Sequence, residues 1–217
     1  MLLRTNKYFL FLIFLLLVSA SNVYTQKNYS GKLSEQKLVQ AFDNLLKLKS
    51  VRFEDNRITN GDTFDSVYEF LYPNKYHLKQ HKVQKGKEIY IDWIIIGNTL
   101  FEKENDKWLK QNNSNLSGIT IETVKTVSKT NNFAVSKDDS LEVIELENKE
   151  TDEDIILLEY TFKTGFLPTK GKVWIKNNLP IRHTYETLPG CINKMSGETV
   201  YDYESKITIT NPLMRNK

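Results

Sequence analysis

Two of the three histidines are spaced as metal ligands are spaced on a helix. His77 and His81 lie four residues apart, so that on a helix both imidazoles would face one metal ion. The segment 75–82 instead alternates polar and apolar residues as a strand does, and a strand separates residues of this spacing by about 13 Å. We therefore predict two solvent-facing histidines and no metal site. The third, His183, stands beside Arg182 in another strand-like segment and is predicted to be structural.

A carboxylate-rich segment is the second candidate for metal chemistry. Its acidic residues are Glu147, Glu150, Asp152, Glu153 and Asp154. Calcium loops of the EF-hand type need a fixed ligand spacing and a glycine at the turn, and this segment has neither. We interpret it as the solvated tip of a hairpin, and we predict no bound metal and no cofactor.

Cys191 is the single cysteine, which excludes an internal disulfide and a cysteine-based zinc site. Cys191 and His183 are the candidates for a nucleophile and its base, but the residues around Cys191 do not resemble a catalytic context. Nucleophile elbows, phosphate-binding glycine loops and Ser/His/Asp arrangements are absent in recognisable form. The sequence therefore predicts a protein that is not an enzyme.

The composition is that of a globular chain. Its 217 residues are 40% hydrophobic and 12% aromatic, which is too rich in aromatics for a disordered chain. Thirty Lys and Arg face 27 Asp and Glu, and the net charge of +3 is too small to indicate a nucleic-acid partner. We expect one folded domain.

Residues 1–26 have the pattern of a secretory signal peptide. Arg4 and Lys7 precede an apolar run over 8–18, which as a helix would span roughly 16 Å, about half a bilayer core. The small residues at 18–20 suit cleavage after Ala20, and cleavage after Gln26 is the alternative. We expect 27–217 to be one mature domain, exported and soluble. It would not be an integral membrane protein, because the apolar run is too short to cross a bilayer. It would not be lipid-anchored, because no cysteine directly follows that run.

One amphipathic helix is predicted over 34–49, with apolar residues at helical spacing. Ser34 is its N-cap candidate, and Lys47 and Lys49 fall in its last turn. Its apolar residues are Leu38, Ala41, Phe42, Leu45, Leu46 and Leu48. A second, short helix is predicted over 119–130.

The rest of the chain alternates as strands do, with turn residues such as Asn60-Gly61 and Gly97-Asn98 about every ten residues. The predicted strands are 51–58, 63–72, 75–82, 88–96, 99–103, 141–147, 154–163, 172–176, 180–188 and 197–210. The fold class is therefore mainly β with α (α+β): a strongly curved antiparallel sheet of about ten strands, with the long helix across its apolar side. Two helices cannot cover so many strands, so a partly hollow concave side is expected.

Aromatic and aliphatic residues of these segments are the candidates to line an apolar binding cavity. They are Phe70, Tyr72, Trp93, Ile95, Trp108, Leu158, Tyr160 and Trp174. The candidates for the lid are Leu38, Phe42 and Leu45. For each aromatic residue taken singly, a place in a filled core is the more common role.

Four segments carry a resemblance to a known family. They are 68–76 (YEFLYPNKY), 96–103 (IGNTLFEK) with Trp108 close behind, 171–182 (GKVWIKNNLPIR) and 207–212 (ITITNP). In this order, after a signal peptide and an early helix, they resemble the LolA/LolB and LppX/LprG-like superfamily of bacterial envelope proteins over residues 34–212. In LolA-type carriers an early-strand arginine helps to latch the lid. Arg52 and Arg57 lie in the corresponding region of this chain, but neither matches the family's pattern closely enough to be assigned that role.

The resemblance implies an unclosed antiparallel half-barrel of about ten strands with a helical lid, which holds the acyl chains of a lipid or lipoprotein. We therefore expect a soluble carrier of lipid or lipoprotein acyl chains that is exported to the periplasm. It would have a role in sorting outer-membrane lipoproteins or lipids, with envelope transport proteins as further partners. The alternative is an extracytoplasmic protein-interaction or sensor module that uses the same scaffold with a filled core.

Overall fold

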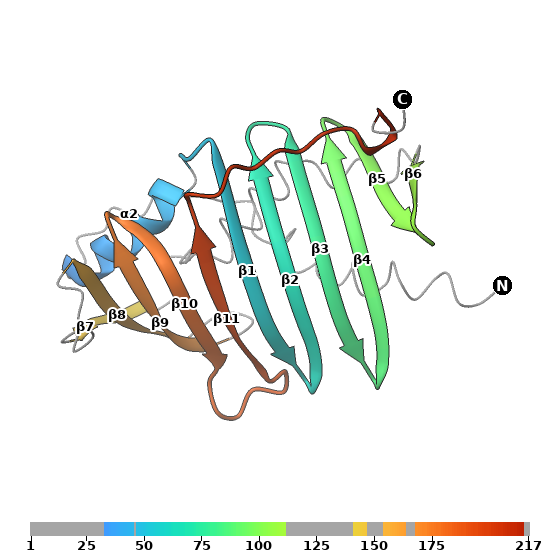
Figure 1. Cartoon of the computed structure of the whole chain (residues 1–217). Helices are drawn as coiled ribbons and strands as arrows, with labels where there is room; N and C mark the ends of the chain where they lie inside the picture. The colour runs from blue at the N-terminus through green and yellow to red at the C-terminus, as the bar shows by residue number, and fades with distance from the viewer. Residues whose placement is uncertain (1–32, 46, 112–140, 147–153, 164–167, 215–217) are drawn as a thin grey trace.

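The chain folds into one antiparallel sheet with a helix on one face (Figure 1). This computed structural model describes residues 33–45, 47–111, 141–146, 154–163 and 168–214. Within these residues the sheet has 11 strands in the order β6-β5-β4-β3-β2-β1-β11-β10-β9-β8-β7, with β6 and β7 at its two edges. The predicted α+β class with an unclosed antiparallel sheet is confirmed, with one strand more than expected.

Two antiparallel meanders make up the sheet, and they meet where β1 pairs with β11. The first meander comprises β1 (Ser50–Thr59), β2 (Asp62–Leu71), β3 (Lys75–Gln84), β4 (Lys87–Ile96), β5 (Thr99–Glu104) and β6 (Lys107–Gln111). The second comprises β7 (Leu141–Leu146), β8 (Ile155–Phe162), β9 (Thr169–Lys176), β10 (Leu179–Thr187) and β11 (Met195–Asp202). The short strand β6 is the one that was not predicted from the sequence.

Tight turns with positive φ connect many of the strands. Asn60-Gly61, Lys85-Gly86, Asn105-Asp106 and Asn177-Asn178 each have both central residues at positive φ. This conformation belongs to the two-residue hairpin turns whose twist matches that of the strands they join. The turn predicted at Asn60-Gly61 is therefore confirmed, and these turns set the register of the strands they join.

Helix α2 (Leu33–Leu45) packs its apolar stripe onto the second meander, mainly against β7 and β10. The helix ends four residues earlier than predicted, so Lys47 and Lys49 lie beyond it. Among the described helices none is long and apolar enough to cross a bilayer. The predicted signal peptide and the predicted helix 119–130 lie outside the described residues.

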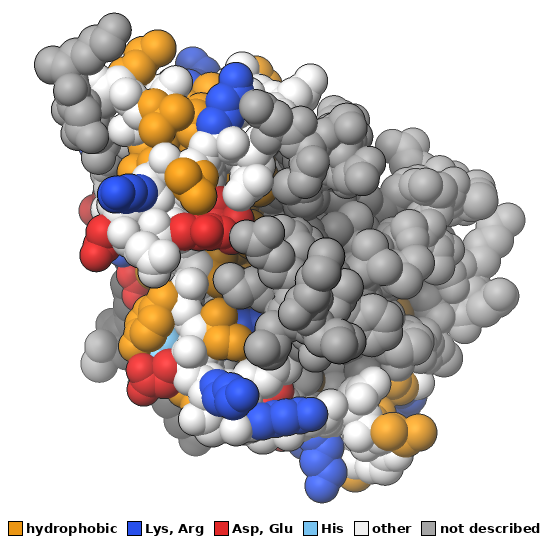
Figure 2. All heavy atoms as spheres, turned by 90° about the vertical axis from the view of Figure 1, so that its right-hand side faces the viewer, with side chains coloured by type: hydrophobic (Ala, Val, Ile, Leu, Met, Phe, Trp, Pro, Cys, Tyr) orange, Lys and Arg blue, Asp and Glu red, His pale blue; other side chains and the backbone are white. Residues whose placement is uncertain are grey.

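The side of the sheet that faces α2 is called the inner face, and the opposite side the outer face. The main apolar core lies on the inner face and joins α2 to both meanders. Its buried members are Leu38, Ala41, Phe42, Leu45, Val51, Phe70, Tyr76, Leu78, Ile95, Leu100, Val143, Leu158, Tyr160, Val173 and Ile175. Seen from the β6 side, the described surface mixes charges of both signs with apolar side chains (Figure 2).

The end of the chain corrects the strand predicted over 197–210. Strand β11 stops at Asp202, whose carboxylate accepts hydrogen bonds from the backbone N–H groups of Glu204 and Ser205, both at 2.9 Å. This side-chain-to-backbone bonding turns the chain out of the sheet. Residues 203–211 then run across the strand ends toward β5 (Figure 1), and Ile209 packs with Ile94 and Phe101 in a second, outer-face cluster.

The packing of α2 gives a stability prediction. Phe42 is 2% exposed and contacts the His183 ring edge-on, with 5.9 Å between centroids. Phe42→Ala should lower the free energy of unfolding by about 3–5 kcal/mol because it leaves a cavity under the helix. Asp43→Ala, at the neighbouring exposed position, should change it by less than about 0.5 kcal/mol in the same urea titration. Equal effects of the two substitutions would contradict the packing of α2.

Candidate binding site on the inner face

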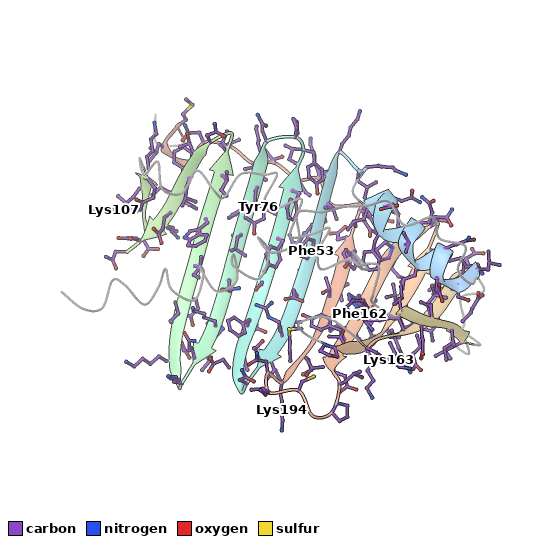
Figure 3. The ribbon with its side chains drawn as sticks, turned by 180° about the vertical axis from the view of Figure 1, so that it is seen from behind. Phe53, Tyr76, Lys107, Phe162, Lys163 and Lys194 are labelled. Atoms are coloured by element: carbon purple, nitrogen blue, oxygen red, sulfur yellow. The ribbon has the colours of Figure 1, made fainter. Side chains whose placement is uncertain are left out.

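An aromatic layer covers the inner face where the two meanders join (Figure 3). Phe53 of β1 is its centre, with ring centroids 4.6 Å from Tyr68, 5.6 Å from Phe70 and 5.8 Å from Tyr201. Phe70 in turn lies 4.9 Å from Tyr76. Stacked and tilted rings at these separations are favourable beyond the area they bury. The layer forms because aromatic residues occupy alternate positions of neighbouring strands and so share one face.

Two glycines make room for tyrosine side chains on the same face. Gly171 is the register partner of Tyr160, and a Cβ at Gly171 would lie 2.0 Å from the Thr184 carbonyl oxygen and 2.8 Å from the Tyr160 hydroxyl. Gly197 is likewise the partner of Tyr185, whose hydroxyl would lie 2.6 Å from a Cβ there. Each tyrosine side chain therefore passes over a glycine of the next strand, an arrangement that holds strand register.

A small polar group interrupts the apolar inner face. The Asp55 carboxylate is 8% exposed, and its Oδ1 accepts hydrogen bonds from the Tyr185 and Thr199 hydroxyls, both at 3.0 Å. Burial raises the pKa of Tyr185, so its hydroxyl remains a donor at neutral pH. These bonds compensate for the cost of removing a carboxylate from water.

A buried histidine lies beside this group. His183 is 8% exposed, and its Nε2 lies 2.8 Å from the Tyr160 hydroxyl. Burial lowers the pKa of His183 to about 4 and raises the pKa of Tyr160, so both side chains are neutral at pH 7. The prediction that His183 has a structural role agrees with this position, and Cys191 lies elsewhere, in the β10–β11 loop, with its Sγ 3.9 Å from the Pro168 carbonyl oxygen.

The structure brings most of the predicted binding residues together on the inner face. Phe70, Ile95, Leu158 and Tyr160 are buried there, and Tyr72 and Trp93 pack against the same core. The predicted lid residues Leu38, Phe42 and Leu45 are the buried stripe of α2.

Trp108 and Trp174 lie on the outer face, away from the other predicted residues. Val173 and Ile175 of β9 are buried in the inner core, so the alternation of the strand turns Trp174 outward, where the Arg182 guanidinium lies 4.6 Å from its ring centroid. Trp108 packs with the outer cluster around Ile94.

Sequence reasoning missed Phe53, Tyr201 and the polar trio of Asp55, Thr199 and Tyr185. A signal for Asp55 was present, because it follows Val51 and Phe53 at the same alternating phase and is therefore a polar residue at a core position. The partners of Asp55 were not visible, since Thr199 is 144 residues away along the chain.

The two early arginines separate onto different faces. Arg57 shares the phase of Asp55, and its guanidinium lies 4.9 Å from the ring centroid of Phe64, its register partner. Arg52 lies on the outer face, 2.9 Å from Glu54 and 3.5 Å from Glu69.

Comparison with solved structures finds the crystal structure of LprF from Mycobacterium bovis, with a TM-score of 0.50 and 10% sequence identity. The match covers 82% of this chain and 96% of that chain. A likeness at this identity shows the fold alone. No protein-family model and no curated protein sequence matches the chain.

The buried His183 gives a pH prediction. The unfolded chain binds a proton at His183 with the ordinary pKa of 6.5, whereas the folded chain binds it only near pH 4, so acid favours the unfolded state. The contribution of the neutral His183 ring to the unfolding free energy is fully present above pH 6.5 and is lost as the pH falls toward 4. Between pH 7 and pH 5 the unfolding free energy of the natural chain should fall by about 2 kcal/mol more than that of His183→Gln. Urea titrations at the two pH values measure this, and equal losses would show that His183 is not buried as a neutral ring.

Proposed function

We propose that the protein is an exported binding protein that holds an acyl chain of a lipid or lipoprotein against the inner face, with α2 as part of the lid. The observation that carries this proposal is the extent of the inner apolar layer. It runs from the α2 stripe through Val51 and Phe70 to Ile95 and Leu100, whereas α2 makes its main contacts only with β7 and β10. Apolar side chains therefore continue along the inner face well beyond the strands that the helix contacts.

The energetics of this binding are favourable without a charged site. Burying one 16-carbon chain contributes about 12 kcal/mol at about 0.8 kcal/mol per methylene, before the costs of ordering. The aromatic layer around Phe53 offers broad, rigid contact area for such a chain. The polar group at Asp55 interrupts that surface, so we place the acyl chain on the Phe70–Ile95 side of it.

The sequence and the fold together suggest the setting. The leader pattern indicates export to the periplasm, and the superfamily resemblance suggests a role in lipid or lipoprotein sorting with envelope transport proteins as partners. The likeness to LprF supports the scaffold of this proposal and not its ligand.

A second candidate is an extracytoplasmic interaction or sensor module with a filled core. The observation that favours it is the close packing under α2, where Leu158 and Val173 have no exposed surface. In that case the inner face is structural throughout, and no acyl ligand binds.

Organic extraction of the purified protein followed by mass spectrometry tests the two candidates. The carrier should release a co-purified lipid and should bind an uncharged pyrene-labelled acyl ester that unlabelled lipid displaces. Neither result is expected of a filled-core module, so the failure of both would overturn the carrier proposal.

A matched pair of tryptophan substitutions locates the binding face. Trp93 lies on the inner face, where its Nε1 donates to Glu102 at 3.1 Å, whereas Trp174 lies on the outer face. Trp93→Ala should weaken binding of the pyrene ester by about tenfold or more, because it removes a large apolar contact. Trp174→Ala should leave that affinity unchanged. The reverse order of effects would place the ligand on the outer face.

A further inference from the structure

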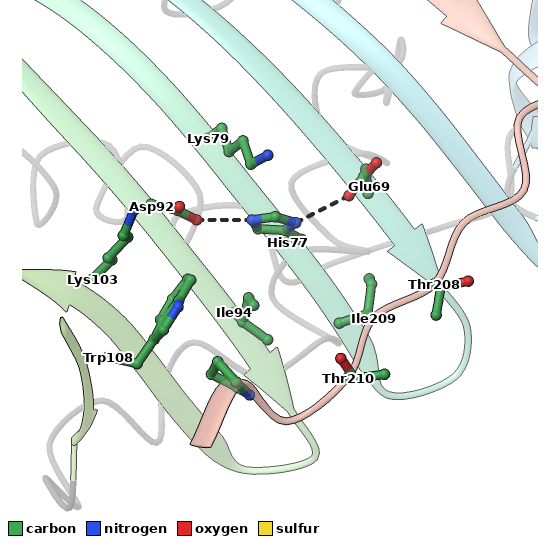
Figure 4. A pocket seen from close by; sticks show the side chains of 11 residues that line it. Glu69, His77, Lys79, Asp92, Ile94, Lys103, Trp108, Thr208, Ile209 and Thr210 are labelled. Carbon is green, nitrogen blue, oxygen red and sulfur yellow. Dashed lines mark hydrogen bonds and ion pairs between the residues drawn. The ribbon is translucent and has the colours of Figure 1, made fainter. Parts of the chain in front are cut away.

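The outer face carries a pocket of about 390 Å³ that the acyl-binding proposal does not use (Figure 4). Strands β2–β6 form its floor and walls, and residues 208–212 of the C-terminal segment close one side. The Lys75 ammonium fixes that segment by donating to the Ile209 carbonyl oxygen at 3.0 Å. The volume lies within the range of small-molecule sites.

The carboxylates of this pocket are already engaged by a histidine. The His77 Nδ1 lies 3.0 Å from Glu69 Oε2, and its Nε2 lies 2.8 Å from Asp92 Oδ1. Both acidic side chains of the pocket therefore contact the same imidazole ring. His77 is only 15% exposed, which corrects the prediction that it faces solvent; His81 is 33% exposed.

The two lysines of the pocket are less engaged. Lys79 and Lys103 lie on either side of Asp92 (Figure 4). The Lys103 ammonium lies 3.2 Å from Asp106, whose side chain is 96% exposed, so this ion pair contributes little. Lys79 has no ion pair with another described residue.

An apolar wall completes the pocket. Trp108 of β6, the register partner of Lys103, lines it together with Ile94, Ile209 and Pro212. The pocket therefore combines donor-bearing cations with a flat aromatic surface.

We propose that this pocket binds a small anionic ligand, with a carboxylate or phosphate group that accepts hydrogen bonds from the ammonium groups of Lys79 and Lys103 and an apolar, flat part against Trp108. Two lysines and two carboxylates line the pocket, and both carboxylates are engaged by His77, so the lysine ammonium groups are the donors left for a ligand. A cationic ligand would lie against both ammonium groups. A neutral ligand would leave the ammonium groups unused.

The probes are benzoate and phenyl phosphate, which share the flat ring and differ in the anion. Benzamide is the neutral control for charge, and inorganic phosphate tests the anion without the ring. The chain has three tryptophans, and Trp108→Phe assigns the indole N–H signal of Trp108 in a ¹⁵N–¹H spectrum of the full chain. The uncharged pyrene ester is monitored separately, so the outcome is independent of acyl binding.

Benzoate or phenyl phosphate should shift the Trp108 signal saturably, and whichever binds more tightly identifies the anion. Lys79→Gln and Lys103→Gln should each weaken that binding about three- to tenfold, whereas Lys87→Gln, at an exposed position of β4 outside the pocket, should not. Equal binding of benzamide, no saturable shift with either anion, or equal effects of the three lysine substitutions would overturn the proposal. The remaining indole signals report whether each variant is folded.

Discussion

The pairing of β1 with β11 is the interaction on which the rest of the structure depends. Within each meander, strands pair only with their neighbours along the chain. The pairing of β1 with β11 joins the two meanders into one sheet with a continuous inner face. The hydrogen bond from Thr199 to Asp55 crosses this seam in its buried part. At the end of the seam, the Asn60 backbone N–H donates to the Lys194 carbonyl oxygen and the Asn60 side-chain oxygen accepts from the Lys194 N–H, both at 2.8 Å.

The seam also explains why a carboxylate lies within an apolar layer. A buried Asp55 without partners would destabilise the fold, whereas with the Tyr185 and Thr199 hydroxyls it favours the one register that brings them together. Tyr185 reaches Asp55 by lying over Gly197, where a larger residue would collide with its ring. Strand register and burial of the polar group therefore depend on each other.

Local signals in the sequence were enough for much of the fold. The alternation of residues over 63–72 and 88–96 predicted β2 and β4, and Asn60-Gly61 predicted a turn that the structure forms with both residues at positive φ. The fold class followed from these signals because hairpins are decided by neighbours in the chain.

The predictions that differ from the structure depended on information that is not local. The alternation of Tyr201, Tyr203, Ile207 and Ile209 continues past the point where Asp202 turns the chain, so pattern alone predicted one long strand. Apolar character alone also placed Trp174 with the binding residues, although its neighbours Val173 and Ile175 occupy the inner phase. For the inner face, the aliphatic residues were predictable, but the partners of Asp55 were not, because they are set by the pairing of β1 with β11, the first and the last strand along the described chain.

The same alternation separates two kinds of chemistry on shared strands. In β3, Tyr76 and Leu78 belong to the inner apolar core, while His77 and Lys79 line the outer pocket. In β4, Trp93 and Ile95 face inward, while Asp92 and Ile94 line the pocket. A side chain on one face has no direct contact with a ligand on the other, so substitutions can test the two proposed sites separately. Both proposed sites are built on the same sheet. A loss of binding can therefore be assigned to one site only after the variant has been shown to be as stable as the natural chain.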